Sequence, residues 1–188
     1  MQSYLAALTL ILLVGMVLVR SWVLNRQGIR AIHFVNLDRK DFLIPPFALF
    51  YLYLVFANAF HWPTVSTQAF FQSDLIAWVG VGLCVAGLLL FFWSLVSFGR
   101  SFRVGIDPDT PDKLFTTGAF AVSRNPLYVA IWIVLLGQFL VFPNWILLVY
   151  VGAATWLLHR QVVREEAYLR QRYGNAFSQY ASRVRRYM

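Results

Sequence analysis

The chain alternates between long apolar runs and two strongly polar stretches. The apolar runs cover residues 4–24, 42–60, 75–98, 127–142 and 145–158. A helix needs roughly 20 residues to cross a hydrocarbon core of about 30 Å. The first three runs reach or approach this length and the last two are shorter. The pattern therefore predicts an all-α polytopic membrane protein with five transmembrane helices.

Only Pro143 and Asn144 separate the last two apolar runs. So short a connection predicts a tight antiparallel helical hairpin. We expect the hairpin to span fully only if the polar side chains of His159 and Arg160 extend to the membrane interface.

The two polar stretches, residues 99–126 and 160–187, flank this hairpin and hold 11 of the 16 basic residues. Apolar spacing after Gln161 predicts a helix that leaves the membrane and ends at Gly174. Asn175 is then expected to cap a short final helix with an apolar stripe of Phe177, Tyr180 and Val184. That helix either lies in the interface or turns basic side chains toward phosphate or substrate; these are Arg183, Arg185 and Arg186.

Small residues recur in the third apolar run at three- and four-residue steps: Ala77, Gly80, Cys84 and Gly87. Such a stripe lets helix backbones approach closely in lipid, so we expect it to pack against another helix.

Composition supports the membrane assignment, because 60% of residues are apolar and only 13% are charged. No Lys or Arg precedes the first run, whereas Arg20, Arg26 and Arg30 follow it. Helix one is thus expected to be retained, with its N-terminus outside. Threading then places all 16 Lys and Arg on or near the cytosolic side. Orientation and anionic lipid account for the net charge of +8, so we expect no nucleic-acid partner.

No internal repeat or linker divides the chain, so residues 1–188 are expected to form one domain. Residues 1–98 supply three membrane helices, and residues 99–188 supply a loop, the hairpin and a cytosolic helical segment.

The sequence lacks the motifs of metal sites, common hydrolases and nucleotide-binding proteins. Cys84 is the single cysteine, and the three histidines form no ligand spacing, so no metal site is expected. Catalytic-triad order, a nucleophile elbow, a Walker loop and a strand-linked glycine motif are also missing.

Asn125 followed by Pro126 is a strong helix-start signal, since asparagine caps free N–H groups and proline fits the first helical position. Arg124, just before it, adds a forked cation suited to carboxylate or phosphate. The alternative is a simple anchor to lipid phosphate. Glu165 and Glu166 point about 100° apart on a helix, so one is expected to bind and one to brace, unless both only offset basic charge.

Taken together, G-A-F-x-x-S-R-N-P-L-Y at residues 118–128, the hairpin, and R-E-E-x-x-L-x-x-x-Y-G-x-x-x-x-x-Y from residue 164 resemble the isoprenylcysteine carboxyl methyltransferase family. The similarity covers about residues 97–187, and phospholipid N-methyltransferases share much of it. The length and five apolar runs resemble the short prokaryotic members.

This resemblance implies an integral-membrane enzyme that binds S-adenosylmethionine in a cytosolic pocket and takes a lipophilic acceptor from the bilayer. It assigns Arg124 and Glu166 to orienting the acceptor. It assigns these residues to the cofactor: Thr117, Gly118, Phe120, Asn125, Tyr128, Glu165, Glu166 and Tyr173. A prenylcysteine-type carboxylate is the leading acceptor. The alternatives are phospholipid headgroup N-methylation and a non-catalytic protein that keeps the scaffold.

The chain departs from the family pattern at Asn125, where histidine is usual, at Ala119 for proline and at Phe120 for tyrosine. Asparagine can cap a helix and donate a hydrogen bond, but it cannot titrate near neutral pH as histidine does. No general base is therefore expected at position 125.

Overall fold

The computed structural model describes residues 1–26, 44–63, 69–98 and 114–188. Its helices are α1 (Gln2–Arg26), α2 (Ile44–Phe60), α3 (Asp74–Phe98), the 3-10 helix η3 (Gly118–Ala121), α4 (Pro126–Val141), α5 (Trp145–Tyr173) and α6 (Asn175–Arg183). Within these ranges there is no β-strand, and each apolar run predicted to be a helix is one. The all-α prediction is confirmed for the described residues.

Three helices, α1, α3 and α5, are long and apolar enough to cross a membrane, whereas α2 and α4 are shorter apolar helices. Many large apolar side chains on these helices face outward, including Leu18, Leu89 and Trp156, each at least 60% exposed. Outward apolar surface of this kind suits a lipid surrounding, so the chain is a membrane protein.

Helices α3 and α4 form the tightest contact of the bundle. A Cβ added to Gly80 would lie 2.7 Å from the Gly137 carbonyl oxygen, and one added to Gly137 would lie 2.6 Å from that of Gly80. Gly87 meets α4 about two turns further along, against the Ala130 carbonyl. The predicted small-residue stripe is confirmed at Gly80, Cys84 and Gly87, since only small residues allow the two backbones to approach so closely.

A buried polar bridge joins α1 to α4. The Gln138 side chain is fully buried and donates to the Ala6 carbonyl at 2.7 Å and to the Thr9 hydroxyl at 3.1 Å. An interhelical hydrogen bond inside an apolar bundle fixes the axial register of the two helices, because any other register would leave the amide unpaired.

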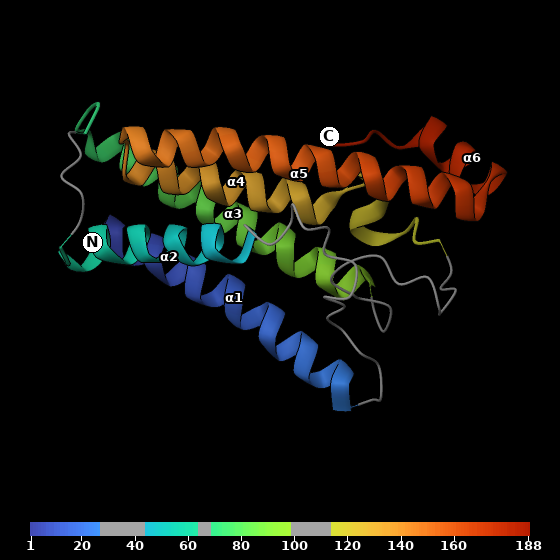
Figure 1. The fold of residues 1–188 in the computed structure, drawn as a ribbon, viewed down its shortest axis with the longest axis horizontal. Helices are drawn as coiled ribbons and strands as arrows, with labels where there is room; N and C mark the ends of the chain where they lie inside the picture. Colours follow the sequence, from blue (N-terminus) through green and yellow to red (C-terminus); the bar gives the residue numbers. More distant parts are fainter. Residues whose placement is uncertain (27–43, 64–68, 99–113) are drawn as a thin grey trace.

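Helices α4 and α5 lie side by side and form the predicted hairpin (Figure 1). Asn144 caps α5, because its side-chain oxygen accepts a hydrogen bond from the Leu147 N–H at 2.9 Å. Helix α5 then runs without a break into the polar stretch and ends before Gly174, whose φ of 50° is a left-handed conformation that glycine adopts easily.

The final helix α6 corrects one detail of the sequence analysis. Asn175 is the first helical residue and not the cap, which is Gly174, and no side chain caps the helix. Phe177 and Tyr180 are buried as the predicted stripe requires, whereas Val184 follows the helix and is only partly buried. The apolar face of α6 therefore packs on the protein itself.

Candidate active site

The segment before α4 is fixed to the end of α3. The N–H of Ala119 donates to the Ser97 hydroxyl at 3.0 Å, and the Phe120 ring packs edge-on against Phe98 with centroids 4.6 Å apart. Gly118 has a φ of 63°, and a Cβ there would collide with the Ser97 hydroxyl. Glycine is thus required at position 118 both for its backbone conformation and for space.

A buried carboxylate, that of Glu166 on α5, is the centre of the site. The Arg124 guanidinium donates to both of its oxygens, at 3.1 and 3.3 Å. The Asn125 amide adds a hydrogen bond at 3.1 Å, and Arg186 adds an ion pair at 2.9 Å. Bidentate arginine pairing of this kind is among the stronger polar interactions in proteins.

The tail, residues 184–188, is pinned to the same place by its backbone. The Arg124 N–H donates to the Arg185 carbonyl at 3.0 Å. The Arg186 carbonyl accepts from the Ser123 hydroxyl at 3.3 Å and the Asn125 amide at 3.1 Å. Because both side chains and backbone take part, the tail is held in one position against the start of α4.

Further along, the tail lies against α4 and α5 through Tyr187. Its ring packs edge-on against Trp132, with centroids 4.7 Å apart, and its hydroxyl is 2.7 Å from His159 Nδ1. The aromatic contact and the hydrogen bond extend the tail's attachment about two helical turns deeper along the hairpin.

Helix α6 is attached to η3 through Tyr180, whose buried hydroxyl donates to the Phe120 carbonyl at 2.6 Å. Burial raises the pKa of Tyr180 to about 12, and the Arg124 charge opposes this effect. Tyr180 therefore stays protonated, and remains a donor, throughout the physiological range.

Glu165 points to a different set of partners, as expected for adjacent positions on a helix. Its carboxylate accepts from the Tyr128 hydroxyl at 2.5 Å and from the Gln161 amide at 3.0 Å. Glu165 and Tyr128 are only partly buried, whereas Glu166 is 7% exposed. The two adjacent glutamates thus bind separate sets of side chains, and Glu165 is the less enclosed of the two.

The structure brings most of the candidate residues together. Arg124, Asn125 and Glu166 form the buried network, and Tyr128 and Glu165 form a partly buried pair beside it. Thr117 and Gly118 are exposed at the entry to η3, with Phe120 buried behind them. Tyr173, at the end of α5, is partly buried and makes contacts of its own. Residues 99–113 of the expected cofactor-binding loop lie outside the described residues.

Two expectations about polar side chains are corrected. Asn125 stands at the cap position of α4 but makes no capping hydrogen bond, because its amide is used by Glu166 and the tail. In one of the two alternatives for the final helix, Arg186 faced phosphate or substrate, and it is paired with Glu166 instead. Both corrections have one cause, the buried carboxylate, which attracts every donor within reach.

The sequence analysis did not identify three residues of this network, Ser123, Tyr180 and Tyr187, as polar contacts. Ser123 lies inside the G-A-F-x-x-S-R-N-P-L-Y motif, which was a usable signal. The hydrogen bonds of Tyr180 and Tyr187 join segments about 60 and 28 residues apart, and no local pattern marks such pairs.

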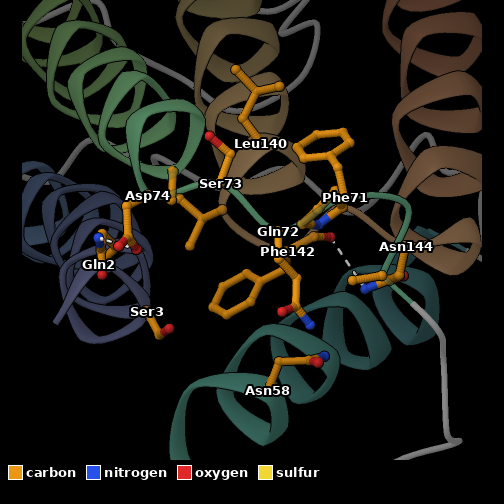
Figure 2. A pocket seen from close by; sticks show the side chains of 14 residues that line it. Gln2, Ser3, Asn58, Phe71, Gln72, Ser73, Asp74, Leu140, Phe142 and Asn144 are labelled. Atoms are coloured by element: carbon orange, nitrogen blue, oxygen red, sulfur yellow. Dashed lines mark hydrogen bonds between the residues drawn. The ribbon is translucent and has the colours of Figure 1, made fainter.

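The described residues hold no group of three or more His, Cys, Asp or Glu side chains that could bind a metal ion. A cavity of about 290 Å³ lies at the opposite end of the bundle, where the α4–α5 turn meets the starts of α1 and α3 (Figure 2). The sequence analysis did not anticipate this cavity.

Comparison with known proteins adds the family. Residues 75–176, more than half of the chain, match the family described as phospholipid methyltransferase. Protein-S-isoprenylcysteine O-methyltransferase B of Arabidopsis thaliana is 28% identical over 108 residues, which are 56% of this chain and 55% of that protein. Proteins named "Probable protein-S-isoprenylcysteine O-methyltransferase" from Oryza sativa subsp. indica and subsp. japonica are 27% identical over 112 residues, 58% of this chain and 59% of each.

The chain thus spans little more than half the length of the curated relatives it matches. No solved structure matches it. The family match covers α3, η3, the hairpin and the start of α6, and so includes Arg124, Asn125, Glu165 and Glu166; Tyr180 and the tail, residues 184–188, lie beyond it. The resemblance inferred from the motifs is confirmed, and the chain belongs to the phospholipid methyltransferase family.

Proposed function

We propose that this protein is an integral-membrane methyltransferase that uses S-adenosylmethionine to methylate a lipophilic acceptor. Family membership and the names of the relatives support the reaction class. The observation that carries the proposal is the meeting of the two motif clusters: the start of α4 and the α5 carboxylates form one hydrogen-bonded site, although about 40 residues separate them.

The residues present fit such a cofactor, which carries a sulfonium and an ammonium group beside a nucleoside. Glu165 offers a partly buried carboxylate for positive charge, and Tyr128 offers a hydroxyl. Phe98 and Phe115 are partly exposed near Thr117 and Gly118, and their ring centroids lie 5.7 Å apart. Aromatic rings stack on nucleobases and attract cations. We assign Tyr173 to the rim of the proposed cofactor site, and Phe120 and Asn125 to its wall.

When bound, S-adenosylmethionine supplies an electrophilic methyl group that transfers by in-line displacement. Such a reaction depends mainly on proximity and alignment. We therefore assign Arg124 and Glu166 a positioning role: they hold the tail and the start of α4 in place, and so orient the acceptor through the walls of the site.

The acceptor has two candidates. A prenylcysteine-type carboxylate needs no base, and the relatives' names favour it. The family description favours a phospholipid amine, which must first lose a proton. Purified protein given methyl-labelled cofactor with farnesylcysteine or with phosphatidylethanolamine should label one of them. Label in neither, together with no binding of S-adenosylhomocysteine at millimolar concentration in calorimetry, would support the non-catalytic alternative.

We also propose that all five apolar helices span the bilayer, with the N-terminus outside and the site at the cytosolic surface. Single introduced cysteines test which side of the membrane each end of the bundle faces, because native Cys84 is buried. In sealed inside-out vesicles, exposed Ser178→Cys should react with a membrane-impermeant maleimide and exposed Gln72→Cys should not. The reverse pattern would place the site on the other side.

A further inference from the structure

The cavity at the far end of the bundle is built by four helices. Gln2 and Ser3 come from α1, Asn58 from α2, Asp74 from α3 and Leu140 from α4 (Figure 2). Helix α4 starts at the candidate site and ends at this cavity, so its 16 residues separate the two by about 24 Å. The cavity is therefore independent of the proposed methyl-transfer site.

Its wall is polar and carries a single kind of charge. Asp74 is the one charged side chain among the described residues that line it, and no Lys, Arg or His takes part. The carboxylate accepts a hydrogen bond from the neutral Gln2 amide at 3.3 Å. The remaining polar groups of the wall are amides and hydroxyls: Ser3, Asn58, Gln72, Ser73 and Asn144. Such a wall favours a cationic group beside Asp74, and its amides and hydroxyls can donate hydrogen bonds to a neighbouring phosphate.

Aromatic side chains around this end place the cavity at the level of lipid headgroups. Tyr4, Trp62 and Trp145 are 52%, 52% and 65% exposed. Phe60 packs between Tyr4 and Trp62, and Phe70 packs on Trp145. Exposed Trp and Tyr at one end of a transmembrane bundle form the belt that marks the membrane interface.

We propose that this cavity binds the headgroup of a phospholipid that carries an ammonium group, with Asp74 as its counter-ion. The volume of about 290 Å³ lies at the lower limit of pockets for drug-sized ligands, which suits a headgroup better than a nucleoside cofactor. Apolar side chains in the same wall, including Phe71, Leu140 and Phe142, accommodate the adjoining glycerol and upper acyl carbons.

Asp74 also lies in the first turn of α3, where a carboxylate stabilises the helix dipole. That role and lipid binding differ in what they predict. A purely helical role changes stability equally whichever lipid is present. The proposed role makes the effect of Asp74 depend on the headgroup.

The test uses the full, delipidated chain in a neutral detergent without cofactor, with native mass spectrometry to measure lipid binding. Phosphatidylethanolamine carries the ammonium group, and phosphatidylglycerol of the same acyl chains lacks it. Asp74→Asn should weaken phosphatidylethanolamine binding about two- to fivefold, the range of an exposed ion pair. Phosphatidylglycerol binding should not weaken. Ala77→Leu, which narrows the cavity, should weaken phosphatidylethanolamine as well.

Glu165→Gln is the matched control, because it makes the same chemical change at the other end of the bundle. Asp74→Asn should weaken phosphatidylethanolamine binding by the same factor whether or not Glu165→Gln is also present. Two results would overturn the proposal: equal affinities of Asp74→Asn and the unmodified chain for phosphatidylethanolamine, or an equal loss for both lipids. Because no turnover is measured, this result stands whether or not the protein transfers methyl groups.

Discussion

The buried carboxylate of Glu166 offers the clearest test of how the candidate site is held together. Replacing it with glutamine keeps the size and one acceptor oxygen but removes the charge. Arg124 and Glu166 are only 12% and 7% exposed, and breaking such a buried pair costs about 3–5 kcal/mol. Arg186 is 40% exposed, so its own pair contributes at most about 1 kcal/mol. We expect Glu166→Gln to lower the free energy of unfolding by about 3 kcal/mol.

The neighbouring Glu165→Gln is the control, since it makes an identical change next door. Glu165 bonds to the hydroxyl of Tyr128 and the amide of Gln161, which a neutral acceptor can still satisfy, so we expect a loss of about 1 kcal/mol or less. Unfolding in mixed detergent and sodium dodecyl sulfate, followed by circular dichroism, measures both variants. Hydrogen exchange of residues 184–187 should quicken in Glu166→Gln alone. Equal losses for the two variants, or an unchanged tail, would refute the assignment of Glu166 as the brace.

Three further outcomes are expected. Gly137→Ala should destabilise the protein by about 1–3 kcal/mol, because the new Cβ would meet backbone atoms of α3. Gly152→Ala is the control and should not destabilise it, because its Cβ would enter open space. Similar melting points for the two variants would contradict the close packing of α3 and α4. Arg186→Gln should speed hydrogen exchange in the tail while changing the unfolding free energy by less than about 1 kcal/mol, and an unchanged exchange rate would show that the backbone bonds suffice. Because the pKa of Tyr180 is raised, its stabilising effect is complete below pH 10 and is lost as pH rises through about 12. Tyr180→Phe should therefore remove this alkaline loss of stability from a pH series of melting curves. An identical loss in both proteins would exclude Tyr180 as its source.

The helices were predictable because their signals are local. Apolar runs of nearly membrane length gave α1 to α5, Pro143 and Asn144 gave the hairpin, and Gly174 gave the end of α5. The spacing of Gly80 and Gly87 also predicted a helix-packing face, because glycines allow close approach whichever helix is the partner.

Partners of polar side chains were harder to predict. Asn125 was expected to cap α4, which is its best use in isolation, yet it donates to Glu166 from 41 residues away. The buried charge decides which partner Asn125 takes, because an unpaired carboxylate in the protein interior costs far more than a missing side-chain cap. Gln138 follows the same logic, since its partners on α1 lie about 130 residues earlier.

The site residues drawn from the family resemblance stay predictions about chemistry, although the structure groups most of them. Their geometry bears on the roles: Glu166, expected to orient the acceptor, is enclosed by donors, and Glu165 beside it is the less enclosed carboxylate.

The unbroken course of α5 links the site to the thickness of the membrane. Its 29 residues measure about 43 Å, whereas a hydrocarbon core of about 30 Å needs at most some 20 of them. On the proposed topology, Glu165 and Glu166 therefore lie on the part of α5 that projects beyond the core. A stiff rod that tilts to match a thinner bilayer carries these carboxylates with it, and α4 must follow because the two are joined at both ends. Acyl chain length is accordingly a variable to control in any reconstitution of the proposed activity.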